Sequence, residues 1–306
     1  RLVREADRRK PALAILTDFP GFHLRLARKL VPRGIRNVYY ICPQFWAWRP
    51  WRVRLIRERF VKALCIFPFE EKFFRNAGVS TEFIGHPLVG AVSATLSREQ
   101  FCAAQGLDPG GKIVTVLPGS RAGELAHHLP VLQEACALIH GKVPTQFVAA
   151  AAHAQNMERL KAGWPAALTV RVVEGQTYNA LAAADAAIVS SGTATVEAAL
   201  LDAPMVVIYK VSSMTATLAG PLVRTPFFAM VNLIAERKVV PELVQDRFTP
   251  ERVAAETLRL LEDAKARKEL RSGLAEVRRK LGPPGAIERA ADHIAALLGP
   301  GTGNAS

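Results

Sequence analysis

The sequence predicts an α/β protein with two Rossmann-like domains, each built on a parallel sheet. Three observations support this prediction. Short apolar runs alternate with helical patterns along the chain, which is typical of parallel strands joined by crossover helices. The 306 residues are enough to bury two separate cores. Between residues 86 and 111 the alternation loosens around Pro87, Gly106 and Pro109, which indicates a domain boundary.

The first series of elements begins with a basic helix that Pro11 ends. Continuous apolar runs then predict strands, and the amphipathic stretches between them predict helices. The expected strands cover residues 12–16, 37–41, 63–67 and 81–85, and the expected helices cover 24–30, a basic stretch ending at Arg59, and 70–76.

A second series begins at Lys112, after the looser segment. The expected strands cover residues 112–117, 146–150, 168–173, 186–189 and 205–209, and the expected helices include 125–139, 178–184, 196–200, 250–280 and 286–298. We therefore expect one domain at residues 1–105, a second at 106–281, a C-terminal helix at 282–298 and a flexible, glycine-rich tail at 299–306.

The stretch from Ser190 to Glu197 is the most informative loop, because it joins a buried strand to a helical face. Gly192 lets a ligand approach the backbone, and the free N–H groups of a first helical turn attract an anion such as phosphate. Position 194 is alanine, so Glu197 has no capping-box partner and can accept hydrogen bonds from hydroxyl groups, as an acidic residue does with a ribose. A solvated glutamate near a positive helix end is the alternative.

The charge of the chain is unusual for a globular protein. The formal net charge is +13, and the isoelectric point is near 10.0. Such a balance favours an anionic partner: nucleic acid, anionic lipid headgroups or phosphorylated substrates. The four cysteines are widely spaced without a Cys-x-x-Cys pair, so neither a zinc nor a redox motif is indicated. Cys42, Cys65 and Cys136 lie in apolar runs and are expected to be buried thiols in a reducing compartment. No apolar run reaches the length of a membrane span.

Two charged residues follow expected strands, at the edge where Rossmann-like sheets bind ligands. Asp18 comes just after the strand at 12–16. Its carboxylate suits a general base, or it hydrogen-bonds its own turn. Arg121 follows Gly119 and Ser120 after the strand at 112–117. Its guanidinium suits a diphosphate, or it is a surface arginine at a strand end.

Three of the four tryptophans, Trp46, Trp48 and Trp51, lie in one segment with the arginines from Arg49 to Arg59. Three interpretations stay open: plain core beside a solvated face, stacking of nucleic-acid bases, and a membrane interface, which favours both amphipathic rings and cations. The histidines lack a third ligand at metal spacing, and no two aspartates are separated by a single residue. A site without metal, built from helix ends and arginine, is therefore expected.

Taken together, these motifs resemble those of lipid-A-disaccharide synthase, a family of two-domain glycosyltransferases (GT-B architecture) of bacterial outer-membrane biogenesis. The most diagnostic string is Pro43-Gln44-Phe45-Trp46-Ala47-Trp48-Arg49, preceded by Tyr39-Tyr40. Further matches follow in the family's order nearly from end to end. They are Pro68-Phe69-Glu70, Gly85-His86-Pro87-Leu88, Leu117-Pro118-Gly119-Ser120-Arg121 with Glu124, Ser191-Gly192-Thr193-Ala194-Thr195-Val196-Glu197, Asn232 with Arg237, and Val240-Pro241-Glu242-Leu243 with Gln245.

The resemblance implies a hexosyltransferase of lipid A biosynthesis, cytoplasmic and peripheral on the inner face of the inner membrane. It would transfer 2,3-diacylglucosamine from its UDP conjugate to 2,3-diacylglucosamine 1-phosphate with inversion, without a cofactor. Asp18 matches the family's essential aspartate, the base on the acceptor hydroxyl. The implied UDP site comprises Arg121, Ser191, Gly192, Thr193, Glu197, Asn232 and Gln245, and the implied acceptor or lipid side comprises Trp46, Trp48, Arg49 and His86. No nucleic-acid partner is expected, and a homodimer stays open.

The chain departs from the family pattern in several places. Gly21 and His23 stand where the family usually has Asp and Asn, and Val231 stands where Pro is expected. The family's N-terminal strand and glycine-rich loop are also not found, so we expect an incomplete first sheet and weak or no activity. Two alternatives stay open: another UDP-sugar transferase or epimerase of the same architecture, and a basic nucleic-acid-binding module with steeply salt-dependent binding.

Overall fold

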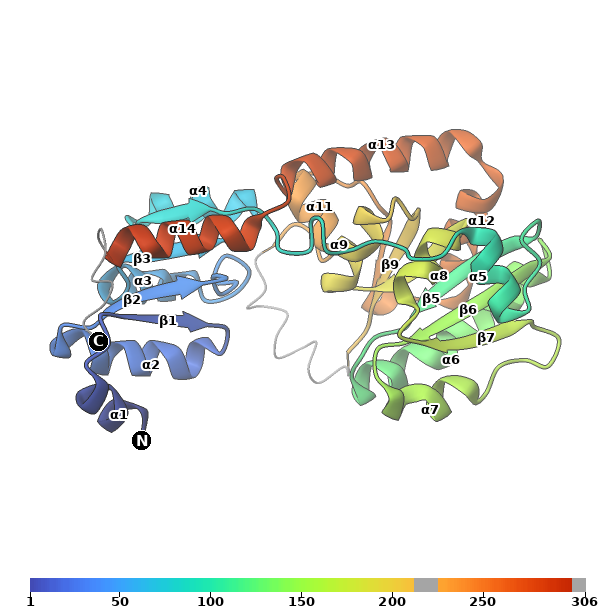
Figure 1. The fold of residues 1–306 in the computed structure, drawn as a ribbon. Helices are drawn as coiled ribbons and strands as arrows, with labels where there is room; N and C mark the ends of the chain where they lie inside the picture. The colour runs from blue at the N-terminus through green and yellow to red at the C-terminus, as the bar shows by residue number, and fades with distance from the viewer. Residues whose placement is uncertain (212–224, 299–306) are drawn as a thin grey trace. The chain divides into compact units, whose positions relative to one another are not determined.

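The computed structural model describes residues 1–211 and 225–298, which form two compact units (Figure 1). The first unit is built mainly from residues 1–91 and the C-terminal stretch that begins at Lys280, and the second unit from residues between Val92 and Arg279. Helix α5 (Arg98–Gln105) packs against α8 (Thr177–Ala183) in the second unit. The expected boundary at 105/106 comes after α5, and the expected tail at 299–306 lies outside the described residues.

A four-stranded parallel sheet forms the centre of the first unit, with the strand order β1-β2-β3-β4. Tyr39, Ile56 and Phe74 are fully buried in its core. Helix α2 packs on the sheet through Leu24, Ala27 and Leu30, three buried positions at helical spacing. The elements are β1 (Leu13–Thr17), β2 (Arg36–Tyr40), β3 (Lys62–Cys65), β4 (Thr81–Phe83), α1 (Leu2–Arg9), α2 (Pro20–Leu30), α3 (Val53–Arg59), α4 (Pro68–Asn76) and α14 (Ala286–Leu298), with 3-10 turns η1 (Val31–Arg33) and η2 (Pro50–Arg52).

A six-stranded parallel sheet forms the second unit, with the strand order β10-β9-β8-β5-β6-β7. From β5 the chain continues to β6 and β7 on one side of the sheet, and from β8 it continues to β9 and β10 on the other side. The strand order therefore reverses between β5 and β8. Every residue of β8 is buried, which explains its continuous apolar sequence. The strands are β5 (Lys112–Leu117), β6 (Thr145–Ala151), β7 (Val170–Glu174), β8 (Ala186–Ser190), β9 (Met205–Tyr209) and β10 (Glu242–Val244). The prediction of two parallel-sheet α/β domains is confirmed.

The helices of the second unit correct one expectation. The single helix expected at 250–280 is two helices, because Asp263 adopts an extended conformation between them. Asp263 Oδ1 accepts hydrogen bonds from the N–H groups of Lys265 and Ala266, as an N-cap does. Besides α5 and α8, the helices are α6 (Ala122–His140), α7 (Met157–Lys161), α9 (Thr193–Leu200), α11 (Met230–Ala235), α12 (Pro250–Glu262) and α13 (Ala264–Lys280), with 3-10 turns η3 (Ala154–Asn156) and η5 (Gln245–Arg247).

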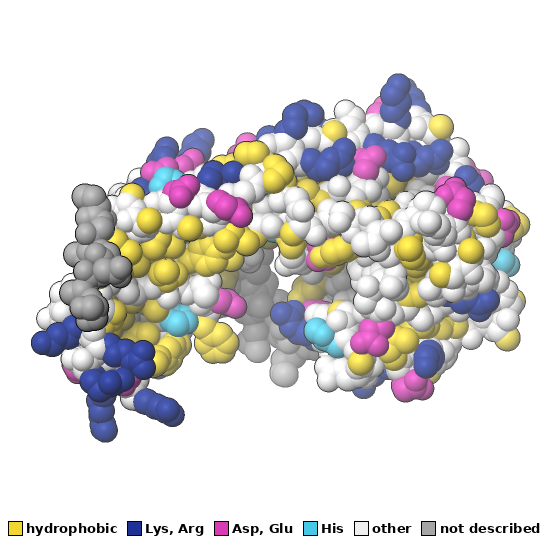
Figure 2. Space-filling view, viewed as in Figure 1, with side chains coloured by type: hydrophobic (Ala, Val, Ile, Leu, Met, Phe, Trp, Pro, Cys, Tyr) yellow, Lys and Arg dark blue, Asp and Glu magenta, His cyan; other side chains and the backbone are white. Residues whose placement is uncertain are grey.

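The surface carries the excess of basic residues in clusters. In Figure 2, dark-blue lysine and arginine side chains gather over α1 and along α13. Within residues 1–211 and 225–298, each helix is too short or too polar to span a lipid bilayer.

Candidate active site

A pocket of about 550 Å³ opens at the carboxyl edge of the second sheet. Residues that follow β5, β6, β7 and β8 line it, so it lies at the reversal of strand order. This is the place where open parallel sheets bind ligands. Five of the seven predicted UDP residues line the pocket: Arg121, Ser191, Gly192, Thr193 and Glu197.

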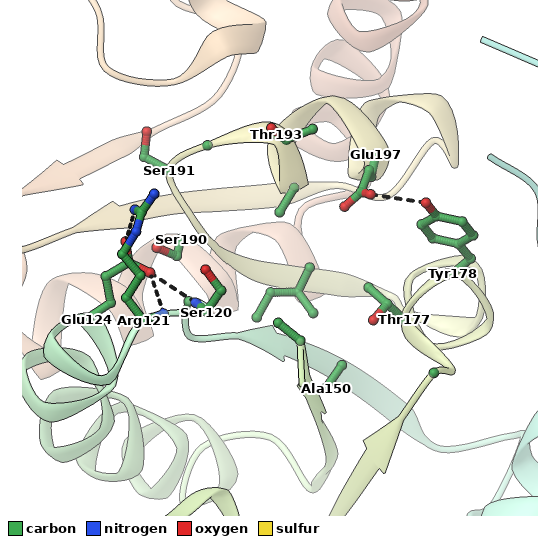
Figure 3. Close-up of a pocket in the computed structure, with 16 residues that line it drawn as sticks. Ser120, Arg121, Glu124, Ala150, Thr177, Tyr178, Ser190, Ser191, Thr193 and Glu197 are labelled. Carbon is green, nitrogen blue, oxygen red and sulfur yellow. Dashed lines mark hydrogen bonds and ion pairs between the residues drawn. The ribbon is translucent and has the colours of Figure 1, made fainter. Parts of the chain in front are cut away.

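The turn between β5 and α6 forms one wall, and Glu124 holds it in shape (Figure 3). Glu124 Oε2 accepts hydrogen bonds from the backbone N–H of Ser120 at 3.0 Å and of Arg121 at 3.2 Å, and Oε1 pairs with the Arg121 guanidinium at 2.8 Å. Burial opposes ionisation of Glu124, but these hydrogen bonds outweigh it and lower the pKa of Glu124. A Cβ on Gly119 would lie 2.6 Å from Glu124 Oε2, so the turn requires glycine. The Arg121 side chain is 79% exposed, so the guanidinium N–H groups that do not contact Glu124 are accessible to an anion.

The loop between β8 and α9 faces this turn across the pocket. Gly192 has φ 146° and ψ −159°, a conformation that only glycine adopts readily. The Ser191 hydroxyl donates to the Phe228 carbonyl at 2.8 Å, which fixes the loop to the segment before α11. The N–H groups of the first turn of α9 therefore end at the pocket, where they favour an anion.

The other end of the pocket carries Glu197 and Tyr178 (Figure 3). The Tyr178 hydroxyl donates to Glu197 Oε1 at 3.0 Å. Burial, then the negative charge of Glu197, raises the pKa of Tyr178. Tyr178 was not among the predicted site residues. The signal was present, because Thr177 and Tyr178 follow β7 and Gly175 as Arg121 follows β5 and Gly119.

Asn232 and Gln245 do not line this pocket. Asn232 is fully buried and its amide is used within the protein: Nδ2 donates to the Val240 carbonyl and to Glu242, and Oδ1 accepts from the N–H groups of Val239 and Val240. Gln245 has φ 52°, and its Oε1 accepts from the N–H of Val211 at 2.9 Å. The side chains therefore shape the loops beside the pocket.

Asn232 nevertheless connects to the pocket through hydrogen bonds. Glu242 accepts from Asn232 Nδ2 at 2.8 Å and from the backbone N–H of Phe228 at 3.2 Å. The Phe228 carbonyl in turn accepts from Ser191. Loss of the Asn232 amide would therefore loosen the support of the Ser191 loop.

Asp18 lies in the first unit, in a strained turn between β1 and α2. Asp18 has φ 56° and Phe19 has φ 41°, both uncommon for residues other than glycine. The hydroxyl of the buried Tyr39 donates to the Asp18 carbonyl at 2.8 Å and secures this turn. The Asp18 carboxylate is exposed, and Phe19 and Phe22 beside it are 74% and 48% exposed. Such strain often accompanies function.

The tryptophan segment divides into a packed part and an exposed part. Trp46 Nε1 donates to Glu70 Oε1 at 3.0 Å, and its ring meets Phe69 edge-on at 4.8 Å. Trp48 is 39% exposed, with the Arg49 guanidinium 4.7 Å from its ring centroid. Trp46 is thus anchored in the first unit, whereas Trp48 and Arg49 face solvent.

His86 lies inside the first unit. It is 4% exposed, and its Nδ1 accepts a hydrogen bond from the Leu88 N–H at 3.2 Å. Burial lowers the pKa of His86 to about 4, so the ring is neutral and closes the turn after β4. Within the described residues, no group of three or more His, Cys, Asp and Glu side chains is placed to hold a metal ion.

Comparison with known proteins identifies relatives of this chain. Residues 1–293 match the family model of lipid-A-disaccharide synthetase. The lipid-A-disaccharide synthase of Solibacter usitatus is 46% identical over 303 residues, which cover 97% of this chain and 78% of the relative. The lipid-A-disaccharide synthase of Myxococcus xanthus is 41% identical over 302 residues, which cover 98% of this chain and 79% of the relative.

Solved structures share the fold at much lower identity. A UDP-GlcNAc 2-epimerase from Neisseria meningitidis has a TM-score of 0.57 and 13% identity, covering 97% of this chain and 79% of its own. MurG from Acinetobacter baumannii has a TM-score of 0.59 and 16% identity, and the match covers 96% of this chain and 76% of the MurG chain. At such identities, only the two-domain α/β fold is transferable.

Proposed function

The chain belongs to the lipid-A-disaccharide synthase family, and we propose that it transfers 2,3-diacylglucosamine from its UDP conjugate to 2,3-diacylglucosamine 1-phosphate. The acceptor hydroxyl attacks the anomeric carbon of the donor, and the bond from that carbon to the UDP oxygen breaks. The products are a β-1,6-linked lipid A disaccharide 1-phosphate and UDP.

The pocket of the second unit is the observation that carries this proposal. One end presents the Arg121 guanidinium and the first turn of α9, and the other presents the Glu197 carboxylate. The first end suits a diphosphate, and the second suits the hydroxyls of a ribose. Negative charge grows on the departing diphosphate, so donors already fixed in place lower the barrier electrostatically.

Asp18 is proposed as the general base that takes the proton of the acceptor hydroxyl. Its carboxylate is exposed at the carboxyl end of β1, and the Tyr39 hydroxyl fixes the backbone beside it. A backbone anchored next to the carboxylate limits the positions that the carboxylate can take, which favours proton transfer from a correctly placed hydroxyl.

The same proposal places the protein on the cytoplasmic face of the inner membrane as a peripheral protein. The exposed Trp48 and Trp51, and a shallow hollow lined by Arg49, Arg52 and Arg54, support it, because interfaces of anionic membranes favour aromatic rings and cations. Sedimentation with anionic vesicles should fall for Trp51→Ala and at high salt; equal sedimentation would contradict membrane contact.

A homodimer would appear in light scattering as twice 33.3 kDa.

The reaction is tested with donor and acceptor in detergent, following UDP release and the mass of the disaccharide. Asp18→Asn should lower kcat by about 10²- to 10⁴-fold and leave UDP affinity, measured by calorimetry, unchanged. Asp7→Asn, which removes an exposed aspartate paired with Arg33, is the matched control. Equal rates for wild type and Asp18→Asn would remove Asp18 as the base. Failure of the chain to bind UDP would contradict the donor site.

A further inference from the structure

Tyr178 and Glu197 form a contact at one end of the pocket. Tyr178 is the second residue of α8, and Glu197 lies in the second turn of α9. Both are half-buried at the same end of the pocket, and Figure 3 shows the Tyr178 hydroxyl pointing at the Glu197 carboxylate. The hydroxyl donates to Oε1 at 3.0 Å. Oε2 accepts no hydrogen bond from the residues that the structure describes.

We propose that Tyr178 is a positioning residue that fixes the Glu197 carboxylate so that Oε2 accepts a hydrogen bond from a ribose hydroxyl of the nucleotide. This inference rests on the proposed nucleotide site. It adds a specificity: the pocket distinguishes a ribonucleotide from a deoxyribonucleotide through a carboxylate whose orientation is set before binding.

Glutamate has a flexible side chain, and this flexibility affects the affinity for a ligand. A free Glu side chain loses rotamer entropy when a ligand immobilises it, at a cost that reduces affinity. A tyrosine hydroxyl lies on a stiff ring with only two side-chain torsions. Its hydrogen bond restricts the glutamate rotamers in the free protein, so less entropy is lost when the ligand binds. A nucleotide that lacks the matching hydroxyl leaves Oε2 unpaired in a part-buried site, and this penalty is the basis of the discrimination.

The contact could instead serve only to brace α8 against α9. The two roles differ in what they predict for the ligand. A brace would affect every nucleotide alike, because its loss would distort the whole pocket. A positioned carboxylate affects only ligands that carry the hydroxyl it binds.

The experiment is a calorimetric titration of UDP, 2′-deoxy-UDP and 3′-deoxy-UDP into wild type and Tyr178→Phe. Tyr178→Phe should raise the Kd of UDP by about two- to tenfold, the effect of one newly mobile side chain. With the deoxy analogue that lacks the bound hydroxyl, wild type and variant should have equal Kd. Tyr209→Phe, which removes a hydroxyl from the same unit outside the pocket lining, is the matched control and should bind UDP as wild type does.

A second measurement uses Glu197→Gln as the background for the tyrosine substitution. Because the tyrosine acts through the carboxylate, Tyr178→Phe should add no further loss of UDP affinity in the Glu197→Gln background. Thermal unfolding of each variant identifies any that fails to fold, in which case Tyr178→Leu, which also lacks a donor, replaces Tyr178→Phe.

Three outcomes would overturn the inference. Equal loss for all three nucleotides would assign Tyr178 to bracing the helices. An unchanged Kd for UDP in Tyr178→Phe would remove the positioning role and leave the nucleotide site intact. If wild type bound no UDP, the proposed function would fail, and this inference with it.

Discussion

Two buried ionisable residues of the first unit, Glu70 and His86, have pKa values moved in opposite directions. Burial raises the pKa of Glu70 from 4.5 to about 7, although Trp46 and two backbone N–H groups donate to its carboxylate. Burial lowers the pKa of His86 from 6.5 to about 4. Both groups are therefore largely uncharged at mildly acidic pH in the folded protein.

The signs of the two contributions to stability oppose each other. Between pH 4.5 and 6.5 the folded state holds the Glu70 proton that the unfolded state has released, so this contribution falls as pH rises. Over the same range the unfolded state binds a proton at His86 that the folded state does not, so this contribution rises with pH. The sum of the two contributions to the unfolding free energy should therefore change little between pH 4.5 and 6.5.

Replacing His86 should therefore expose the pH dependence of Glu70. In His86→Asn the amide oxygen can still accept from the Leu88 N–H, and the unfolding free energy of the first unit should fall by on the order of 3 kcal/mol from pH 4.5 to 7. Urea unfolding in a Trp164→Phe background, followed by tryptophan fluorescence, measures this, since the remaining Trp46, Trp48 and Trp51 are all in the first unit.

Glu70→Gln is the complementary control, whose stability should rise with pH up to about 6.5. A His86→Asn profile parallel to that of wild type would contradict the assignment of these pKa values.

At the scale of single residues, the sequence predicts a shared location where the position of a residue after a strand is sufficient. Arg121, Ser191 and Glu197 follow buried strands, and the structure brings them to one pocket. The sequence does not show that the Asn232 amide is hydrogen-bonded to the backbone of Val240, eight residues away, or that Trp46 donates a hydrogen bond to Glu70. Such pairings depend on how loops close, which hydrophobic periodicity does not encode.

At the scale of elements, helix α6 supports the pocket with two residues four positions apart, Glu124 and His128. His128 is fully buried, and its Nδ1 lies 2.6 Å from the Pro118 carbonyl. Its Nε2 accepts from the Lys210 N–H at 2.9 Å. Burial lowers the pKa of His128, and the neutral ring with its proton on Nδ1 satisfies both contacts. One side chain thus ties the turn after β5 to the end of β9.

Removing this tie should weaken UDP binding. His128→Leu loses both contacts and should raise the Kd of UDP about tenfold, the order expected when a buried polar partner is lost. His128→Asn can retain the bond to Pro118 and should lie between wild type and His128→Leu. Calorimetry with UDP, alongside thermal unfolding, measures both effects.

His127→Asn is the control, because His127 is the exposed neighbour on the same helix. A His128→Leu variant with a lowered melting temperature but unchanged UDP affinity would show that the tie serves stability alone.

Elements were predictable to the extent that they form continuous apolar or amphipathic runs. All nine expected strands have counterparts in the structure. The signal is clearest for a strand such as β8, which is buried throughout and therefore apolar. The short β10 was missed, since it has only three residues and begins with the charged Glu242. The break at Asp263 was missed because the charged pattern continues across it, although an Asp before a helix is a recognised N-cap signal.

At the scale of the whole molecule, the first unit is discontinuous in sequence. Helix α14 belongs to it, although more than 180 residues of the second unit intervene. Arg289 anchors α14 through Nε to the Ile84 carbonyl at 2.8 Å, and through Nη1 and Nη2 to Pro284 and Pro283. The His86 N–H donates to the Leu281 carbonyl at 2.9 Å.

Arg289→Ala should separate the stabilities of the two units. Three hydrogen bonds are lost, so the first unit should lose about 2–4 kcal/mol of unfolding free energy, while the Kd for UDP stays unchanged. Differential scanning calorimetry with and without UDP resolves the two transitions. Arg25→Ala, at an exposed position of α2, should alter neither, and a loss of UDP binding in Arg289→Ala would mean that the units are energetically coupled.

The placement of α14 has a consequence for how the protein is made. Domains generally fold as units during synthesis, with the N-terminal one first. Here the nascent chain has delivered every residue of the second unit by Arg279, while the first unit still awaits its last helix. On the ribosome, the lobe translated later is therefore complete sooner, and the earlier lobe remains open until α14 has been translated.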